Sequence, residues 1–234
     1  MSFKKNKYCI IKNAVDKDLA MFLYNYFHMK KKVYDTCRQA RYISPFETMF
    51  GFYEQPGTPG AIVPHTYCSY ADIALETLLE KLKPIVEKTT GLKVQPAYSF
   101  ARLYKNGDVL PRHKDRFSCE ISTTIYLGGD EWPIYLDPKN DKIEKSIINY
   151  KSQGNKGVKV DLKAGDMLIY RGCELEHWRE KFTKNNCFQA FLHYNNVKTK
   201  GSADNLYDKR LHLGLPNYFV KNSKLPFNIS KIIK

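Results

Sequence analysis

The sequence has few of the features that mark membrane, secreted or zinc-ribbon proteins. Among its 234 residues no apolar run approaches the ~20 residues that cross a bilayer, so we expect no membrane span. The basic start MSFKKNKYCIIKN is followed by only a short apolar stretch, so we expect no secretory signal. No internal repeat or low-complexity linker is present.

Paired cysteines are also lacking. The six cysteines are scattered and form no CxxC pair: Cys9, Cys37, Cys68, Cys119, Cys173 and Cys187. This pattern argues against a disulfide framework or a zinc site, and it indicates reduced thiols in a cytoplasmic protein.

Acidic residues are scarce relative to basic ones, 24 against 38, which gives a net charge of +14. A field of this sign favours an anionic partner such as nucleic acid, an acidic polypeptide or a charged small molecule. It is equally compatible with a solvated basic surface. The basic runs match no known nucleic-acid-binding module.

The length fits one domain, 1–234, with enough chain to bury a core. We expect three parts: residues 1–93 with a strand, loops and supporting helices, residues 94–197 as the β core, and residues 198–234 as a basic C-terminal extension. Oligomeric state and the role of that extension stay open.

The first part of the chain reads as helices and loops around an opening strand. YCIIKNAV predicts the strand, and Asp16 is placed to cap the amphipathic helix that follows it. The turn-rich stretch 42–70 predicts a loop region that borders a site. Apolar residues at helical spacing predict a helix within 70–91, and Gly91 is placed to end it.

Beyond Val94 the pattern changes to short strand-like runs separated by Gly, Asn, Asp or Pro. They are YSFARLY, CEISTTIYL, WPIYL, VKVDL, MLIYR and CFQAFLHY. Helices followed by closely spaced strands predict a mainly β fold, an antiparallel jelly-roll barrel with the helices on one outer face.

Three residues in this region have the pattern of metal ligands. His113 and Asp115 are separated by one residue, so on a strand both point the same way while Lys114 points the other way. His177 follows 62 residues after Asp115, next to another predicted strand. Two imidazoles and one carboxylate can occupy one face of an octahedral iron and leave the opposite face open. Taken singly, each could equally be a surface or strand-end residue.

The segments YSFARLYKNGDVLPRHKDRFSCEISTTIYLG, GDMLIYRGCELEHWREKF and FQAFLHY resemble the prolyl 4-hydroxylase-like branch of the Fe(II)- and 2-oxoglutarate-dependent dioxygenases, over roughly residues 75–195. The resemblance implies a double-stranded β-helix (jelly-roll, cupin-like) core. It further implies that His113, Asp115 and His177 hold catalytic Fe(II). 2-Oxoglutarate and O2 would be co-substrates, with ascorbate as a reductant, and a C–H bond would be hydroxylated with release of succinate and CO2.

The chain departs from the family at the partner of the distal carboxylate of 2-oxoglutarate. Many members place Arg or Lys nine to eleven residues after the second histidine, where this chain has Asn186, Cys187 and Phe188. A buried carboxylate needs a replacement cation. We favour Arg179, with Arg102 next and the loop-borne Lys184 third.

Tyrosines can contribute to the same carboxylate site. By the resemblance, Tyr104 in the Y-x-x-G position and Tyr126 are expected to bind the carboxylate. Nearby, Arg116 either orients Asp115 or faces solvent. Gln189 and His193 line the cavity or pack in the core.

Aromatic residues near the predicted site have a simpler interpretation. Trp132, Pro133 and Tyr135 are expected to build a central strand. Trp178 is expected to pack beside the metal rather than to bind substrate.

A prolyl residue of a peptide or protein is the leading substrate, and the loop FGFYEQPGTPGAIVP is predicted to fold over an extended peptide. A free amino acid, another side chain or a nucleobase stays an alternative. In a different class, the chain would be a non-catalytic basic nucleic-acid-binding protein on a degenerate barrel. The intact ligand set argues against that class.

Overall fold

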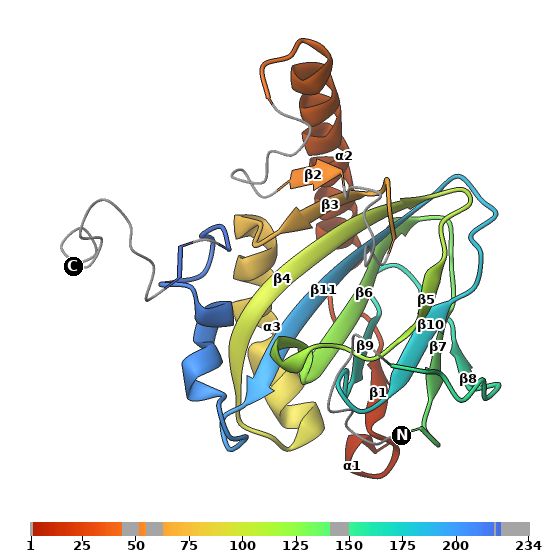
Figure 1. Ribbon diagram of the computed structural model, residues 1–234, viewed down its shortest axis with the longest axis vertical. Coiled ribbons are helices and arrows are strands. Elements are labelled where there is room, and N and C mark those ends of the chain that lie inside the picture. Colours follow the sequence, from red (N-terminus) through yellow and green to blue (C-terminus); the bar gives the residue numbers. More distant parts are fainter. Residues whose placement is uncertain (1, 44–51, 55–62, 141–149, 218, 221–234) are drawn as a thin grey trace.

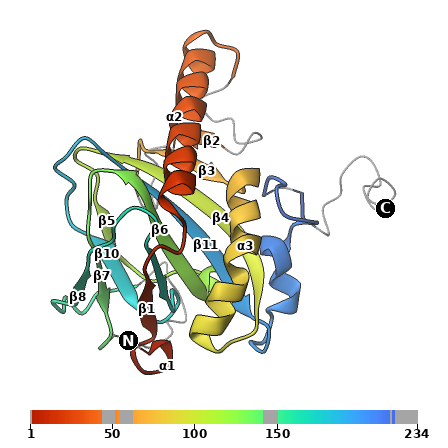
Figure 2. The ribbon, with the colours of Figure 1, turned by 180° about the vertical axis from the view of Figure 1, so that it is seen from behind.

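The computed structural model describes residues 2–43, 52–54, 63–140, 150–217 and 219–220. Two antiparallel sheets face each other in Figure 1, and Figure 2 shows two helices crossing the outer side of the larger sheet. The predicted jelly-roll core with supporting helices is therefore confirmed.

The larger sheet has seven strands in the order β1-β9-β6-β11-β4-β3-β2. Along the chain these are β1 (Tyr8–Ile11), β2 (Phe52–Glu54), β3 (Tyr67–Tyr70), β4 (Val94–Lys105), β6 (Ile121–Gly129), β9 (Met167–Tyr170) and β11 (Asn186–Asn196). The smaller sheet has the order β5-β10-β7-β8, with β5 (Leu110–His113), β7 (Ile134–Asp137), β8 (Val158–Val160) and β10 (Glu176–Arg179). The α-helices are α1 (Phe3–Asn6), α2 (Lys17–Gln39) and α3 (Ile73–Thr90), and the 3₁₀ segments are η1 (Phe117–Cys119) and η2 (Ala203–Lys209).

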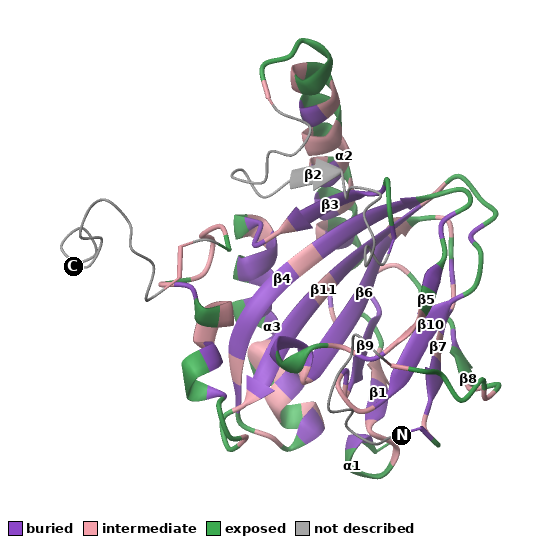
Figure 3. Cartoon of the chain, viewed as in Figure 1, coloured by how far each residue is buried: buried purple, intermediate pink, exposed green. Residues whose placement is uncertain are grey.

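Alternation along the strands gives the larger sheet two different buried faces. On β6, Ile121 and Ile125 pack in the core beneath the helices, whereas Ser122 and Tyr126 point between the two sheets. Both faces are covered, and so the central strands are buried almost throughout their length in Figure 3. One face serves packing and the other is available for a site.

Two predicted helix boundaries are confirmed, the start of α2 and the end of α3, whereas α2 continues past the basic run at 30–32 to Gln39. Asp16 caps α2 by accepting a hydrogen bond from the Leu19 amide at 2.8 Å. Gly91 ends α3 with a φ of 72°, a left-handed conformation that costs glycine little. From α2, Phe27 is fully buried with its ring centroid 4.8 Å from that of Phe188 on β11.

Some details differ from the sequence-based expectation. The predicted loop 42–70 contains strands β2 and β3, which extend the larger sheet at its edge because β3 pairs with β4. Ile73, although it has helical spacing, is exposed at the first turn of α3. Most of the predicted peptide-covering loop, 55–62, and the basic end of the chain, 221–234, lie outside the described residues.

All six cysteines are free, as predicted, and no helix in the described part of the chain is both long and apolar enough to cross a bilayer.

The packing of α2 on the sheet predicts a large difference between two phenylalanines of the same helix. Phe27→Ala should lower the free energy of unfolding by about 3–5 kcal/mol, because it leaves a cavity against Phe188. Phe22→Ala is the matched control, since Phe22 is 63% exposed and its loss should change stability by less than about 0.5 kcal/mol. Chemical denaturation measures both values. Equal small losses would contradict the packing of α2.

Candidate metal centre

Three ligand-type side chains converge where the smaller sheet meets the loop after β5. His113 is the last residue of β5 and pairs with His177 of β10 in antiparallel register, so that the ring centroids lie 4.2 Å apart. Asp115 Oδ1 lies 3.7 Å from His113 Nε2 and 3.5 Å from His177 Nε2. One potential ligand atom from each residue therefore lies within 4.8 Å of the other two, close enough to bind one cation.

Both imidazole rings are oriented in the same way. His113 Nδ1 lies 2.8 Å from the Pro111 carbonyl oxygen, and His177 Nδ1 lies 3.0 Å from that of Leu175. In each case the backbone carbonyl two residues earlier accepts the Nδ1 proton. This leaves the Nε2 lone pairs directed toward Asp115, the arrangement seen in metal-binding histidines.

Asp115 is held from its other side. Its Oδ2 accepts a hydrogen bond of 2.8 Å from Ser122 Oγ, and its backbone amide donates to the Gly172 carbonyl at 2.9 Å. Gly172 permits this approach, because a Cβ atom there would lie 2.3 Å from Asp115 Oδ2. The carboxylate is thus fixed with Oδ1 facing the two histidines.

Burial and mutual charge set the protonation of the three groups. Burial, with a smaller contribution from the charge of His177, lowers the pKa of His113 to about 4. Burial alone would raise the pKa of Asp115, but charge and hydrogen bonding from His177 outweigh it and lower this pKa overall. Burial lowers the pKa of His177, yet the Asp115 carboxylate reverses the effect and raises it. Asp115 is therefore the fixed negative charge of the site.

The three residues line one cavity of about 180 Å³, and Arg102 and Tyr104 line it as well. This volume is smaller than the roughly 300–1,000 Å³ of sites that enclose a whole drug-sized ligand. The cavity is therefore sized for a small molecule or a single protruding group rather than for a whole large ligand.

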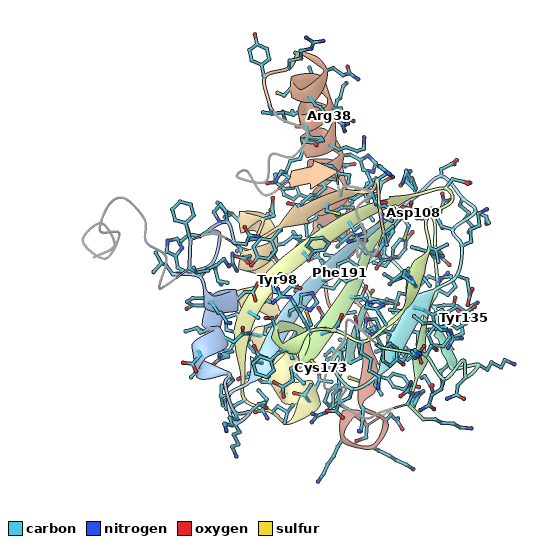
Figure 4. The ribbon with its side chains drawn as sticks, viewed as in Figure 1. Arg38, Tyr98, Asp108, Tyr135, Cys173 and Phe191 are labelled. Carbon is cyan, nitrogen blue, oxygen red and sulfur yellow. The ribbon has the colours of Figure 1, made fainter. Side chains whose placement is uncertain are left out.

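One wall of the cavity is aromatic. Tyr98 stacks on Tyr70 at 5.1 Å and packs against His193 at 4.5 Å between ring centroids. Phe100 and Phe191 complete the wall from β4 and β11. Figure 4 labels Tyr98 and Phe191 on these neighbouring strands.

The candidate cations occupy three different environments. Arg102 lines the cavity with its guanidinium carbon 5.7 Å from the centroid of the Tyr104 ring. Arg179 is fully buried. Its Nη1 donates to the Trp132 carbonyl, and its Nε has no hydrogen-bond partner among the described residues. Arg179 is not among the cavity-lining residues, and the pairing of β10 with β5 shifts register just before it. Lys184 is exposed in the loop before β11.

Only one of the two predicted tyrosines lines the cavity. Tyr104 lines the cavity, and burial raises its pKa to about 12. Tyr126 does not line it, because its hydroxyl donates to the Gly129 carbonyl at 2.5 Å toward the far end of β6.

Arg116 contacts a residue that the sequence did not suggest. Its two Nη atoms donate to the Asp208 carboxylate, each at 2.7 Å, rather than to Asp115. His193 lines the cavity, with Nδ1 3.1 Å from Ser122 Oγ. Gln189 is buried beyond the cavity and accepts a hydrogen bond from Thr124.

The remaining aromatic residues lie in or beside the smaller sheet. Trp178 is buried and stacks on Tyr135, while the Arg112 guanidinium carbon lies 3.5 Å from the centroid of its ring. Trp132 is buried, but it and Pro133 precede β7, and of the predicted strand residues only Tyr135 lies on β7, an internal strand of the smaller sheet.

Several contributors were absent from the sequence analysis. Ser122, Tyr98 and Phe100 share strand parity with residues that were predicted, so parity alone could have indicated them. Gly172 and Asp208 carry no such signal, because only long-range contacts bring them to the site.

Comparison with solved structures shows that the chain has a known fold. No family model and no curated protein matches the sequence. Among solved structures, the chain is similar to a Pseudomonas putida prolyl-4-hydroxylase at 15% identity and a TM-score of 0.51, over 83% of this chain and 95% of that one. The fold is that of the 2-oxoglutarate-dependent oxygenases.

Two further structures with this fold contain different bound molecules. The epimerase SnoN, in complex with Fe3+, alpha ketoglutarate and nogalamycin RO, matches at 10% identity and a TM-score of 0.58, over 83% of this chain and 81% of that one. A Trichoplax adhaerens prolyl hydroxylase, in complex with a hypoxia inducible factor peptide fragment, matches at 12% identity and a TM-score of 0.52, over 84% and 86%.

Proposed function

We propose that the protein is an Fe(II)- and 2-oxoglutarate-dependent dioxygenase that hydroxylates an unactivated C–H bond. The observation that carries the proposal is the convergence of His113, Asp115 and His177 at one cavity of an oxygenase fold. Two imidazoles and one carboxylate with open positions are the donor set of non-haem iron(II) oxygenases.

The residues present fit an iron ion. Each histidine keeps Nε2 available because Nδ1 is committed to a backbone carbonyl, and Asp115 offers Oδ1 while Ser122 holds Oδ2. His113, Asp115 and His177 would hold Fe(II), which together with 2-oxoglutarate and O2 supplies the oxidising power for hydroxylation. The protein orients the ligands and shields the cavity from water.

For the distal carboxylate of 2-oxoglutarate we propose Arg102 as the cation, with Tyr104 as a hydrogen-bond donor. Both line the cavity that the ligand triad shares, and Arg179 does not. The sequence favoured Arg179 by strand parity, but parity does not account for the register shift between His177 and Arg179.

For the substrate we propose a prolyl residue of a peptide or protein. The cavity of about 180 Å³ is too small for a whole peptide, so a single protruding group would enter it. Its aromatic wall of Tyr98, Phe100 and Phe191 suits a proline ring, since proline-rich segments dock on aromatic-lined surfaces. The Trichoplax prolyl hydroxylase, which shares the fold, is described with a bound peptide.

For the compartment we propose the cytoplasm. The six free cysteines are in keeping with a reducing environment.

The ligand assignment predicts that His113→Ala, Asp115→Ala and His177→Ala each abolish succinate release from 2-oxoglutarate while the fold is kept. Succinate is measured with added Fe(II), and circular dichroism checks the fold. His212→Ala is the control, because His212 is exposed and not among the residues that line the cavity. Full turnover in any of the three ligand variants would sink the assignment.

The co-substrate assignment predicts that Arg102→Ala raises the KM for 2-oxoglutarate at least about tenfold, since a charge-assisted pair is worth about 1.5–3 kcal/mol. Arg102→Lys should recover only part, because lysine lacks the two-pronged donor face. The comparison variant is Arg179→Ala, which should have the smaller effect. If the order is reversed, Arg179 binds the carboxylate. If neither variant changes the KM, both arginine assignments fail and Lys184 is the cation left to test.

The substrate proposal predicts that a proline-containing peptide gains the mass of one oxygen atom per succinate released. The matched control is the same peptide with each proline replaced by alanine. Equal modification of the control would point to another side chain. Modification of free amino acids or nucleotides alone would transfer the activity to those substrates.

A further inference from the structure

The segment after the barrel, residues 198–217, lies against the core beside β4 (Figure 1, dark blue). Arg210 anchors it. Its buried guanidinium donates to Glu76 Oε1 of α3 at 2.7 Å and to the Ala97 carbonyl of β4 at 3.2 Å. This fixes the segment close to the residues that follow Asp115.

Asp208 is the central contact of the segment with the candidate site. Its carboxylate accepts two hydrogen bonds of 2.7 Å from Arg116, one of 2.6 Å from Ser118 Oγ and one of 2.7 Å from the Tyr70 hydroxyl. A bidentate pair of this kind fixes orientation as well as distance. Burial would raise the pKa of Asp208, but Arg116 and the other donors outweigh it and lower this pKa to about 2.

The backbone around Asp208 gives an independent indication. Tyr207, Asp208 and Lys209 have φ values of 57°, 58° and 67°, three consecutive residues in the left-handed region. Residues other than glycine rarely adopt it, and such conformations persist where the surrounding contacts over-determine them, often at functional sites.

The partners of Asp208 belong to the turn that carries a candidate ligand. Arg116 directly follows Asp115, and the Arg116 carbonyl accepts a hydrogen bond of 2.8 Å from the Cys119 amide, which closes the turn 115–119. The Arg116 guanidinium carbon also lies 4.7 Å from the centroid of the Tyr98 ring in the cavity wall.

We propose that Asp208 is a positioning residue for the metal centre. Through Arg116 and Ser118 it holds the turn 115–119, and with it Asp115, in the orientation that binds a divalent cation. The inference rests on the proposed function only in taking His113, Asp115 and His177 as the cation ligands. It does not depend on the identity of the co-substrate or of the substrate.

The test is the affinity of the metal-free protein for Mn2+, measured by electron paramagnetic resonance of the free ion. Asp208→Asn keeps the size of the side chain and removes its charge. It should raise the Kd for Mn2+ by at least about tenfold, because groups that support ligands typically change metal affinity by about 10–100-fold. Asp208→Glu should recover part of the affinity.

Two controls separate positioning from charge and from stability. Asp204→Asn changes the same charge on the same segment at an exposed residue, and its Kd should stay within about twofold of wild type. In an Arg116→Gln background, Asp208→Asn should weaken Mn2+ binding by a much smaller factor than in wild type, because its principal route to Asp115 is already broken. A residue that only stabilises the fold would show the same loss in both backgrounds.

An unchanged Kd in Asp208→Asn overturns the proposal, and so does an undiminished loss in the Arg116→Gln background. If Asp208→Asn does not fold, Arg116→Lys tests the same link, since lysine cannot make the bidentate contact. The variant His113→Ala distinguishes failure of the proposed function from failure of the role of Asp208. If it leaves Mn2+ binding intact, the ligand set and the proposed function fail. If it abolishes binding while Asp208→Asn has no effect, only the role of Asp208 fails.

Discussion

The candidate site depends on the antiparallel pairing of β5 with β10. That pairing sets His113 opposite His177 at a ring separation of 4.2 Å, and both rings then take the same hydrogen bond from Nδ1 to a carbonyl two residues earlier. Asp115 lies beyond the end of β5, so the strand-to-strand hydrogen bonds do not hold it in place. The hydrogen bond from its amide to Gly172 and the one from Ser122 replace that support.

Because side chains alternate along each strand, one face of the larger sheet packs in the core and the other lines the candidate site. Its outer face, which α2 and α3 cross in Figure 2, buries apolar residues such as Ile125 and Phe188. Its inner face carries Ser122, His193 and Arg102, which would be costly to bury unless each had a partner or a ligand. Polar side chains are therefore concentrated on the face that encloses the cavity.

The site extends past the barrel in sequence. Glu76 on α3 and Arg210 on the last described segment form a buried pair, and Asp208 reaches Arg116 across 92 residues of chain. A buried ion pair contributes little net stability, but it fixes geometry once its hydrogen bonds are satisfied. The helices and the terminal segment thus act as a frame around the turn that holds Asp115.

The sequence by itself predicted the double-layer β class, the capped starts or ends of two helices, and the three candidate ligands that the structure brings together. The first two follow from local rules, a period of two along strands and a cap at a helix end. The candidate ligands follow from the His-x-Asp spacing and the resemblance to a known family, although Asp115 lies beyond the end of β5 and not on the strand as the sequence predicts. Tertiary structure alone decided that Arg102 rather than Arg179 lines the cavity and that Tyr126 turns toward Gly129. It also decided that Arg116 pairs with Asp208. A register shift within β10 and a contact between distant segments produce these outcomes. Neither can be read from the hydrophobic periodicity of the sequence.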